Sequence, residues 1–417
     1  MLTKFNINTT RDLLVPDFAC YQMDLMGPVN AAITAGEVDE DFSNLPSWSK
    51  FAANPIKSKG FFTRTLQSMF LGQGGHDELN VDLQTEDYKS QRVGMMFMPA
   101  NTRNDVLELI GNITRETLPG FEVIVLCGTV RHNGRKITNR NAERAVKEIV
   151  EQGRPTLIIA AQMAQRSFSV PEITELYLAY DKGENGATLQ KMSRTLTPGD
   201  IGKVGRIFSL SFDPNRDDKF DAMIIETAQN LVKRAEAKSL REAMSNVLGT
   251  MDIWKCTPDG AIKISSDDYL KEALEVKRIG RVLGKIVNLN LLTPAEVTAL
   301  ATGNSQYFKT NRVGKAQMGK TRNTQANGGT PNHVNNNAQK EIAKAREVIT
   351  SIYENLDIII LGTGSKIMVD AFDQLENDID MQNAVEEEFG VPYSTIYGLF
   401  ERNVISQDWV ELLYDEA

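Results

Sequence analysis

A glutamine and an arginine four residues apart are the first candidates for chemistry in this chain. Gln190 and Arg194 lie in a helical pattern that starts near Ala187 and is stopped by Pro198-Gly199. Residues four apart share one face of a helix, so both side chains can reach one ligand. A placed positive charge is the main help that a protein gives to hydrolysis of a γ-phosphate, and arginine commonly supplies it.

The elements that must position this pair have an α/β rhythm. A buried strand is predicted at Leu157–Ala160, followed by a polar turn and a second strand at Glu175–Tyr180. The polar turn contains Gln165, Arg166 and Ser169. In α/β sheets, loops at strand ends bring such side chains together on a ligand.

Residues 89–215 form the clearest predicted domain. Further strands are expected at Arg92–Met98, Phe121–Leu126 and Arg206–Phe212, with helices after Asn101 or Thr102 and over Thr138–Gln152. This alternation predicts a doubly wound parallel sheet with helices on both faces.

Two of these segments resemble motifs of superfamily 2 helicases. AQRSFSVPEI is similar to motif V (A-R-G-x-D-x-P-x-V), and QKMSRTLTPG is similar to motif VI (Q-x-x-G-R-x-x-R), in the right order and on the right elements. The residues of these two segments resemble those of restriction-type and phage helicases more than those of the DEAD-box RNA family. The chain departs from the patterns at Ser167, Ser169, Ser193 and Thr197, where the family usually has Gly, Asp, Gly and Arg.

The resemblance implies a RecA-like fold and a motor function. It makes this region the second RecA-like domain of a DNA helicase or translocase, with Arg194 and Gln190 facing ATP and Mg²⁺ held by a first domain. Gln165, Arg166 and Ser169 would bind the nucleotide and link it to the nucleic-acid face. The resemblance also implies a phage or mobile-element origin and a role in DNA replication. The N-terminal sequence lacks a signal-peptide core, which predicts a cytoplasmic protein, in host cytoplasm if a phage encodes it.

Several loop residues are candidates for contact with a nucleic-acid backbone. Asn101, Thr102 and Arg103 follow the first strand of the predicted domain, and Gly128 and Thr129 follow the second. A helix cap at Asn101 or Thr102, and an ordinary strand-end turn at Gly128, are the structural alternatives.

A basic stretch without acids runs from Tyr307 to Arg322. Lys309, Arg312, Lys315 and Lys320 lie in it and could follow a phosphate backbone, with a solvated linker as the alternative. Gly314–Thr321 also satisfies the P-loop pattern, although no apolar strand precedes it and no helix-forming sequence follows. Lys277, Arg278, Arg281 and Lys285 form a second basic group on a predicted helix.

The segments missing upstream of residue 90 decide the functional hypothesis. That region has no Walker A motif, no D-E-x-[HD] box and no S-A-T motif. We therefore expect a natural split subunit or a fragment that does not hydrolyse ATP alone and needs a first RecA-like domain or subunit, together with single-stranded or forked DNA. The alternative is a non-catalytic nucleic-acid-binding or assembly subunit that retains the fold.

Composition sets the remaining expectations. The net charge of −9 argues against a wholly basic surface, the three cysteines form no metal pattern, and no apolar run is long enough to span a bilayer. The expected divisions are a remnant of a first motor domain, or bridge from it, at 1–88, the RecA-like domain at 89–215, a helical appendage at 216–303, a flexible basic linker at 304–337 and a small, acidic, mostly helical domain at 338–417. The first division is expected to have a loop at Asp39–Lys57. In the appendage, we expect an amphipathic helix at Asp218–Glu236, a hairpin at WKCTPDGAIKIS and one helix over Asp267–Val287. Within the last, FGVPYSTIYGLFERN could form a helix–turn–helix, and its acidity favours packing over DNA reading.

Overall fold

The fold is described from a computed structural model of the 417-residue chain. The described residues are 17–80, 92–127, 131–132, 135–138, 141–161, 168–182, 187–195, 204–257, 259–287, 289–303, 336–356, 359, 363, 368–376 and 378–405. They separate into two compact units, residues 1–234 with 243–272 and residues 235–242 with 273–417.

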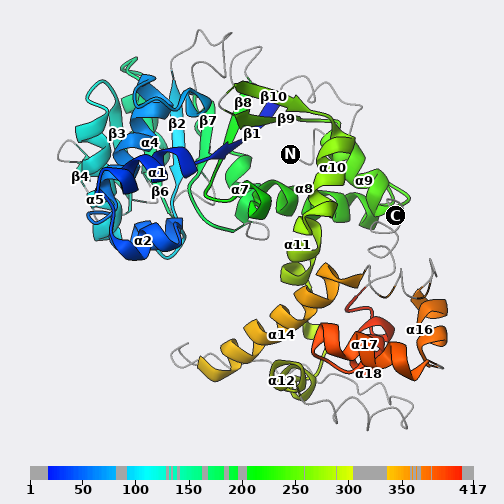
Figure 1. The fold of residues 1–417 in the computed structure, drawn as a ribbon. Helices are drawn as coiled ribbons and strands as arrows, with labels where there is room; N and C mark the ends of the chain where they lie inside the picture. Colours follow the sequence, from blue (N-terminus) through cyan, green and yellow to red (C-terminus); the bar gives the residue numbers. More distant parts are fainter. Residues whose placement is uncertain are drawn as a thin grey trace, which may run out of the picture. The chain divides into compact units, whose positions relative to one another are not determined.

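The first unit is built on one eight-stranded sheet (Figure 1). Its strand order is β10-β9-β1-β8-β7-β2-β6-β3, and every described pairing in it is parallel except that of β10 with β9. The strands are β1 (Asp17–Asp24), β2 (Val93–Phe97), β3 (Glu122–Leu126), β6 (Thr156–Ala160), β7 (Glu175–Leu178), β8 (Val204–Ser211), β9 (Asp252–Thr257) and β10 (Gly260–Ile264); β4 (Arg131–His132) and β5 (Arg135–Lys136) form a separate small ribbon.

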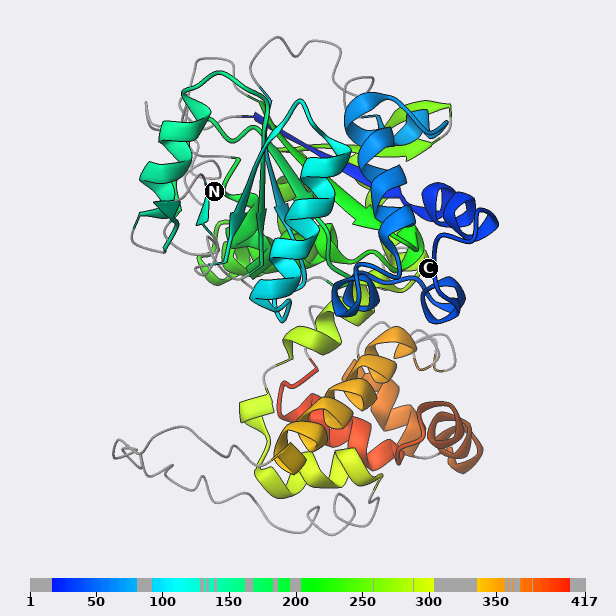
Figure 2. The ribbon, with the colours of Figure 1, turned by 90° about the vertical axis from the view of Figure 1, so that its left-hand side faces the viewer.

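Helices cover both faces of the sheet. One face packs against α1 (Met26–Thr34), α4 (Lys59–Leu71) and α5 (Asn104–Thr117), and Figure 2 shows α5 lying across the strands on this side. The opposite face carries α7 (Ala187–Met192) and α8 (Lys219–Lys233), which pack on each other. The remaining helices of this unit are α2 (Glu40–Asn44), α3 (Trp48–Ala53), α6 (Ala142–Val150) and α10 (Ser266–Glu275), while α9 (Leu240–Leu248) crosses the boundary between the units. The predicted α/β class, with a mostly parallel sheet consistent with a RecA-like fold, is confirmed.

The divisions of the chain differ from the expected ones. Residues 17–24, assigned to a remnant or bridge before residue 88, form β1 and lie inside the sheet between β8 and β9. The predicted hairpin within the helical appendage is confirmed as β9–β10, but it extends the same sheet. The single helix expected over 267–287 is broken at Lys277, which has a positive φ of 57°. The strands of the sheet therefore come from residues 17–264 and not from residues 89–215 alone.

The second unit is helical, as expected for the C-terminal region. Its helices are α11 (Arg278–Ile286), α12 (Pro294–Thr302), α14 (Asn336–Glu354), α16 (Met368–Glu376), α17 (Ile379–Phe389) and α18 (Tyr393–Glu401). Helices α11 and α14 approach closely because Gly280 and Gly284 lack side chains at the contact. A Cβ placed on Gly284 would lie 2.1 Å from the hydroxyl oxygen of Thr350.

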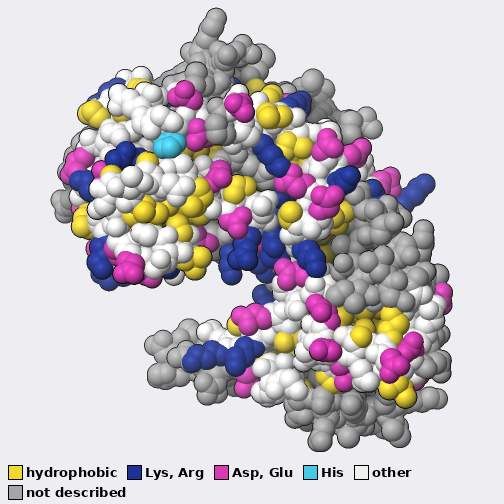
Figure 3. Space-filling model, in the orientation of Figure 1, with side chains coloured by type: hydrophobic (Ala, Val, Ile, Leu, Met, Phe, Trp, Pro, Cys, Tyr) yellow, Lys and Arg dark blue, Asp and Glu magenta, His cyan; other side chains and the backbone are white. Residues whose placement is uncertain are grey.

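Charged side chains of both signs are interspersed on the surface. Figure 3 shows acidic and basic groups mixed over the face of the sheet unit that it draws. None of the helices in the described part of the chain is long and apolar enough to cross a membrane.

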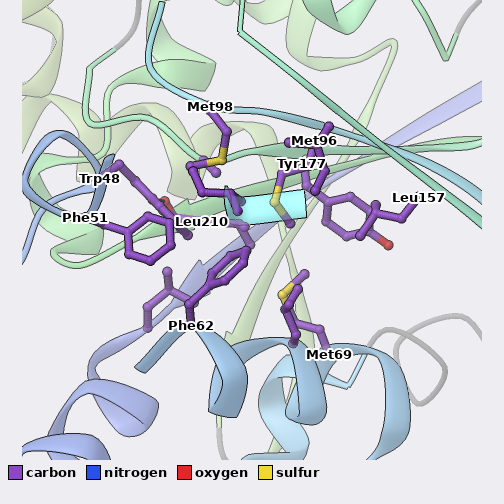
Figure 4. Packing of buried hydrophobic residues seen from close by; sticks show 14 of the residues in the cluster. Trp48, Phe51, Phe62, Met69, Met96, Met98, Leu157, Tyr177 and Leu210 are labelled. Atoms are coloured by element: carbon purple, nitrogen blue, oxygen red, sulfur yellow. Dashed lines mark hydrogen bonds between the residues drawn. The ribbon is translucent and has the colours of Figure 1, made fainter. Parts of the chain in front are cut away.

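A segment expected to be a loop supplies much of the core. Asp39–Lys57 instead contains α2 and α3, whose N-termini are capped by the side chains of Asp39 and Ser47. These helices bury Phe42, Trp48 and Phe51 against α4 and the sheet (Figure 4). The indole Nε1 of Trp48 donates a hydrogen bond of 2.9 Å to the carbonyl oxygen of Leu210 in β8.

Candidate functional site

The connections between strands part at the carboxyl edge of the sheet, beside the ends of β2 and β7. These strands are neighbours, yet the chain after β2 leaves for the face that carries α5, and the chain after β7 leaves for the face that carries α7. Ligands in α/β proteins bind at such a point, where successive connections part to opposite sides of the sheet. The carboxylate of Asp181, just after β7, accepts hydrogen bonds of 2.6 and 2.9 Å from the backbone N–H groups of Trp48 and Ser49. The start of α3 therefore borders this edge.

The predicted nucleic-acid loop lies between β2 and α5, at this edge of the sheet. Asn101 is exposed, whereas the hydroxyl of Thr102 donates a 2.7 Å hydrogen bond to the carbonyl oxygen of Pro99. Arg103 occupies the N-cap position of α5 without a capping side-chain bond and pairs with Asp105, which lowers the pKa of that carboxyl. The expected cap at Asn101 or Thr102 is thus wrong, because the helix begins two residues later.

A buried lysine on the other side was missed by the sequence reasoning. Lys191 of α7 is fully buried, and its Nζ lies 4.0 Å from the centre of the Tyr180 ring and 5.7 Å from that of Phe97. Both rings stand at the carboxyl ends of their strands, so this ammonium lies nearer the edge than its neighbours on α7. The hydroxyl of Tyr180 donates to that of Thr188 at 3.3 Å, which ties the first turn of α7 to β7. One sequence feature pointed to Lys191: it lies three residues after Thr188, so the two side chains share a helix face.

A buried ion pair supports the same edge. Lys219 Nζ lies 2.8 Å from Asp217 Oδ1, with both side chains almost completely buried, and donates a 3.2 Å hydrogen bond to the carbonyl oxygen of Tyr180. The hydroxyl of Ser209 in β8 donates to the other oxygen of Asp217. This pair joins the end of β7, β8 and the start of α8. The sequence reasoning read this region only as the start of an amphipathic helix.

Arg194 connects the two helicase-like segments. Its Nη1 donates a hydrogen bond to the backbone carbonyl oxygen of Phe168, so the segment resembling motif VI holds the segment resembling motif V. The side chain is half-buried, and burial lowers the pKa of the guanidinium. Next to it, Thr195 lies over Gly205, the second residue of β8, where a Cβ would come within 2.9 Å of the threonine side chain. Arg194 therefore lies toward the amino end of β8 and not at the carboxyl edge with Asn101.

Gln190 and Ser169 are both exposed. Gln190 accepts a 2.7 Å hydrogen bond from the hydroxyl of Ser193 through its backbone oxygen, which leaves its side chain at the surface of α7. The backbone N–H of Ser169 faces Glu143 Oε2 of α6 at 3.4 Å. The structure thus brings Arg194 to the segment of Ser169, but does not gather all predicted residues at one point.

The other predicted site residues lie outside the described part of the chain. They are Gln165, Arg166, Gly128, Thr129, Lys309, Arg312, Lys315 and Lys320, and the P-loop-like Gly314–Thr321 also lies there. Among the described residues, no group of three or more His, Cys, Asp or Glu side chains is arranged to hold a metal ion.

Two sequence candidates in the second unit are engaged internally. On α11, Arg278 is fully buried, Lys277 donates to the side-chain oxygen of Asn355 at 2.8 Å, and Arg281 lies 3.9 Å from Glu354. These residues bind the end of α14 and do not form a free basic track.

The possible helix–turn–helix is α17 and α18, joined through Gly390 with φ 62°. Tyr393, Tyr397 and Phe400 of α18 contact the ring of Phe372 in α16. The aromatic face of α18 therefore packs inside the unit.

Comparison of the sequence with models of known protein families and with curated proteins finds no match. The resemblance to superfamily 2 helicases therefore rests on the two sequence segments alone.

Proposed function

We propose that this chain supplies the second motor domain of an ATP-dependent superfamily 2 DNA helicase or translocase. The observation that carries the proposal is the hydrogen bond from Arg194 to the carbonyl of Phe168. It joins the segments that resemble motifs V and VI, which lie 26 residues apart in sequence, on a mostly parallel sheet of the expected class. Such a bond is the coupling that a motor needs between its nucleotide-facing and nucleic-acid-facing segments.

In this proposal, ATP and Mg²⁺ are held by a first RecA-like domain or subunit. Gln190, exposed on α7, contributes a side chain to the nucleotide, and Arg194 contributes positive charge and fixes the Phe168 segment. Gln165, Arg166 and Ser169 transmit the nucleotide state to DNA, and Asn101, Thr102 and Arg103 contact its backbone. A protein of this kind works in the cytoplasm, or in host cytoplasm if a phage encodes it.

The test is ATP hydrolysis with and without single-stranded DNA, by the chain alone and with candidate first-domain partners. We expect no hydrolysis by the chain alone and DNA-stimulated hydrolysis with the right partner. Gln190→Ala should reduce the stimulated rate without affecting folding, because its side chain is exposed; Glu236→Gln, also exposed, is the control. DNA-stimulated hydrolysis by the chain alone would overturn the half-motor proposal.

A second candidate is a nucleic-acid-binding or assembly subunit without catalysis. The hydrogen bond of Arg194 favours this second candidate. A guanidinium that is bonded to a backbone carbonyl has a structural role whether or not ATP is bound. Salt-dependent binding of single-stranded DNA that no partner or nucleotide changes would support this candidate.

A further inference from the structure

One stretch of this acidic chain contains no acid. Residues 297–340 include no Asp or Glu, whereas the whole protein has 55 acidic residues and a net charge of −9. The cations in the stretch are Lys309, Arg312, Lys315, Lys320, Arg322 and Lys340. A local excess of positive charge of this length attracts polyanions even when the protein as a whole repels them.

The structure fixes the base of this stretch. It is flanked by α12 and α14, which pack on each other, and the hydroxyl of Thr298 in α12 donates a 2.9 Å hydrogen bond to Glu341 Oε2 in α14. Helix α12 ends at Gly303, in the left-handed conformation, and α14 begins at Asn336. This contact joins the two helices between which the acid-free stretch runs in sequence.

The first half of α14 is open to solvent on most of its circumference. Lys340, Ile342, Ala343 and Lys344 are all exposed, and Ala345 is the first residue of the helix known to be buried. Figure 3 shows basic side chains gathered along this half of the helix, beside atoms drawn in grey.

The cations on this half-helix are not neutralised by described residues. Lys340, Lys344 and Arg346 form no ion pair with any residue in the described ranges, although Arg346 donates to the backbone oxygen of Lys285 at 3.0 Å. By contrast, Lys57 and Lys59 of the first unit pair with Asp39 and Glu116. Glu341, three residues before Lys344, is bonded to Thr298.

We propose that the exposed first half of α14 binds the phosphate backbone of single-stranded DNA through Lys340 and Lys344. Lys340 and Lys344 lie one turn apart on the same side of the helix, so both can contact one strand. The positive end of the helix dipole adds to their charge. The choice of DNA rests on the proposed function, while the position of the contact rests on the exposure and charge of α14.

The experiment measures binding of a fluorescently labelled oligothymidylate by anisotropy between 50 and 300 mM salt. Single-strand binding loses about 0.7 in the slope of log affinity against log salt for each phosphate contact removed. We expect Lys340→Gln with Lys344→Gln to reduce the slope by about 1.4 and to weaken binding at low salt by roughly tenfold. Lys57→Gln with Lys271→Gln removes the same charge from exposed positions of the first unit and should leave the slope unchanged.

The outcomes separate the two proposals. Unaltered binding by the α14 variant, when the unchanged protein binds with a clear salt dependence, overturns the α14 contact alone. Equal losses in the α14 and control variants also overturn it, because the effect would then be one of net charge. Absence of binding by the unchanged protein overturns the DNA partner of the proposed function and the α14 contact together.

Discussion

The guanidinium of Arg194 donates a hydrogen bond to the backbone carbonyl oxygen of Phe168, 26 residues earlier in the chain. A side chain at the end of α7 thereby fixes a segment that has no regular secondary structure between residues 168 and 174. Within the segment, the backbone N–H of Ile173 donates a 3.1 Å hydrogen bond to the carbonyl oxygen of Val170.

Arg194→Ala should loosen this segment. A hydrogen bond from a charged donor contributes about 1.5–3 kcal/mol, and partial exposure of the side chain places the expected loss at about 1–2 kcal/mol. Hydrogen exchange of the amides at 168–174 should accelerate, and Arg194→Lys, which retains a donor, should show a smaller change. Gln190→Ala is the control on the same helix; equal exchange in all three variants would contradict the linking role.

The Asp217–Lys219 pair should be sensitive to removal of one partner. Lys219→Met leaves a buried carboxylate without its cation, which costs about 3–5 kcal/mol, whereas Asp217→Asn with Lys219→Met should recover much of that loss. Urea denaturation measures both, with Lys233→Met, exposed on the same helix, as the control. A double variant as unstable as the single one would show that the pair's geometry, and not its charge balance, stabilises this edge.

Trp48 should be essential to the first unit although it lies in a six-residue helix. Trp48→Ala removes a fully buried ring and the bond to Leu210, so we expect a loss of about 3–5 kcal/mol in the free energy of unfolding. Trp48→Phe should cost less. Leu45→Ala, three residues away but 66% exposed, should change stability by less than about 0.5 kcal/mol, and a comparable effect of the two alanine variants would refute the assignment of Trp48 to the core.

Glu175 should make stability fall as pH rises. Burial raises the pKa of this carboxyl above its ordinary 4.5, against the opposing effects of Arg92 and the Tyr177 hydroxyl. The folded state therefore retains the proton to higher pH than the unfolded state, and stability declines from pH 4.5 upward until the folded-state pKa is passed.

Glu175→Gln cannot titrate, so its free energy of unfolding should improve relative to the unchanged protein across that window. Denaturation curves at successive pH values measure the difference, with Glu236→Gln as an exposed control. A constant difference across the window would show that Glu175 titrates alike in both states.

Sequence predicted those elements whose residues carry a regular apolar pattern. The strands at β2, β3, β6, β7 and β8 are short, mostly apolar runs, and each was placed within two residues at either end. α2 and α3 were missed because Asp39 and Ser47, which cap helices, also mark loops.

The site was predicted less well than the fold, for a physical reason. Arg194 was recognisable by its type and spacing, but Lys191 and Lys219 were not, since lysine is normally solvated and nothing local signals its burial. Their positions depend on contacts with Tyr180, which only the assembled sheet provides.

The place of β1 between β8 and β9 has a consequence for how the protein is made. Asp17 pairs with Val204, 187 residues later in the chain, so β1 is synthesised long before either of its neighbours in the sheet. Closing such a distant contact is entropically costly and slows folding. Until β9 has been synthesised, β1 has an unpaired edge, and a chain that ends before residue 252 should be prone to aggregate through it.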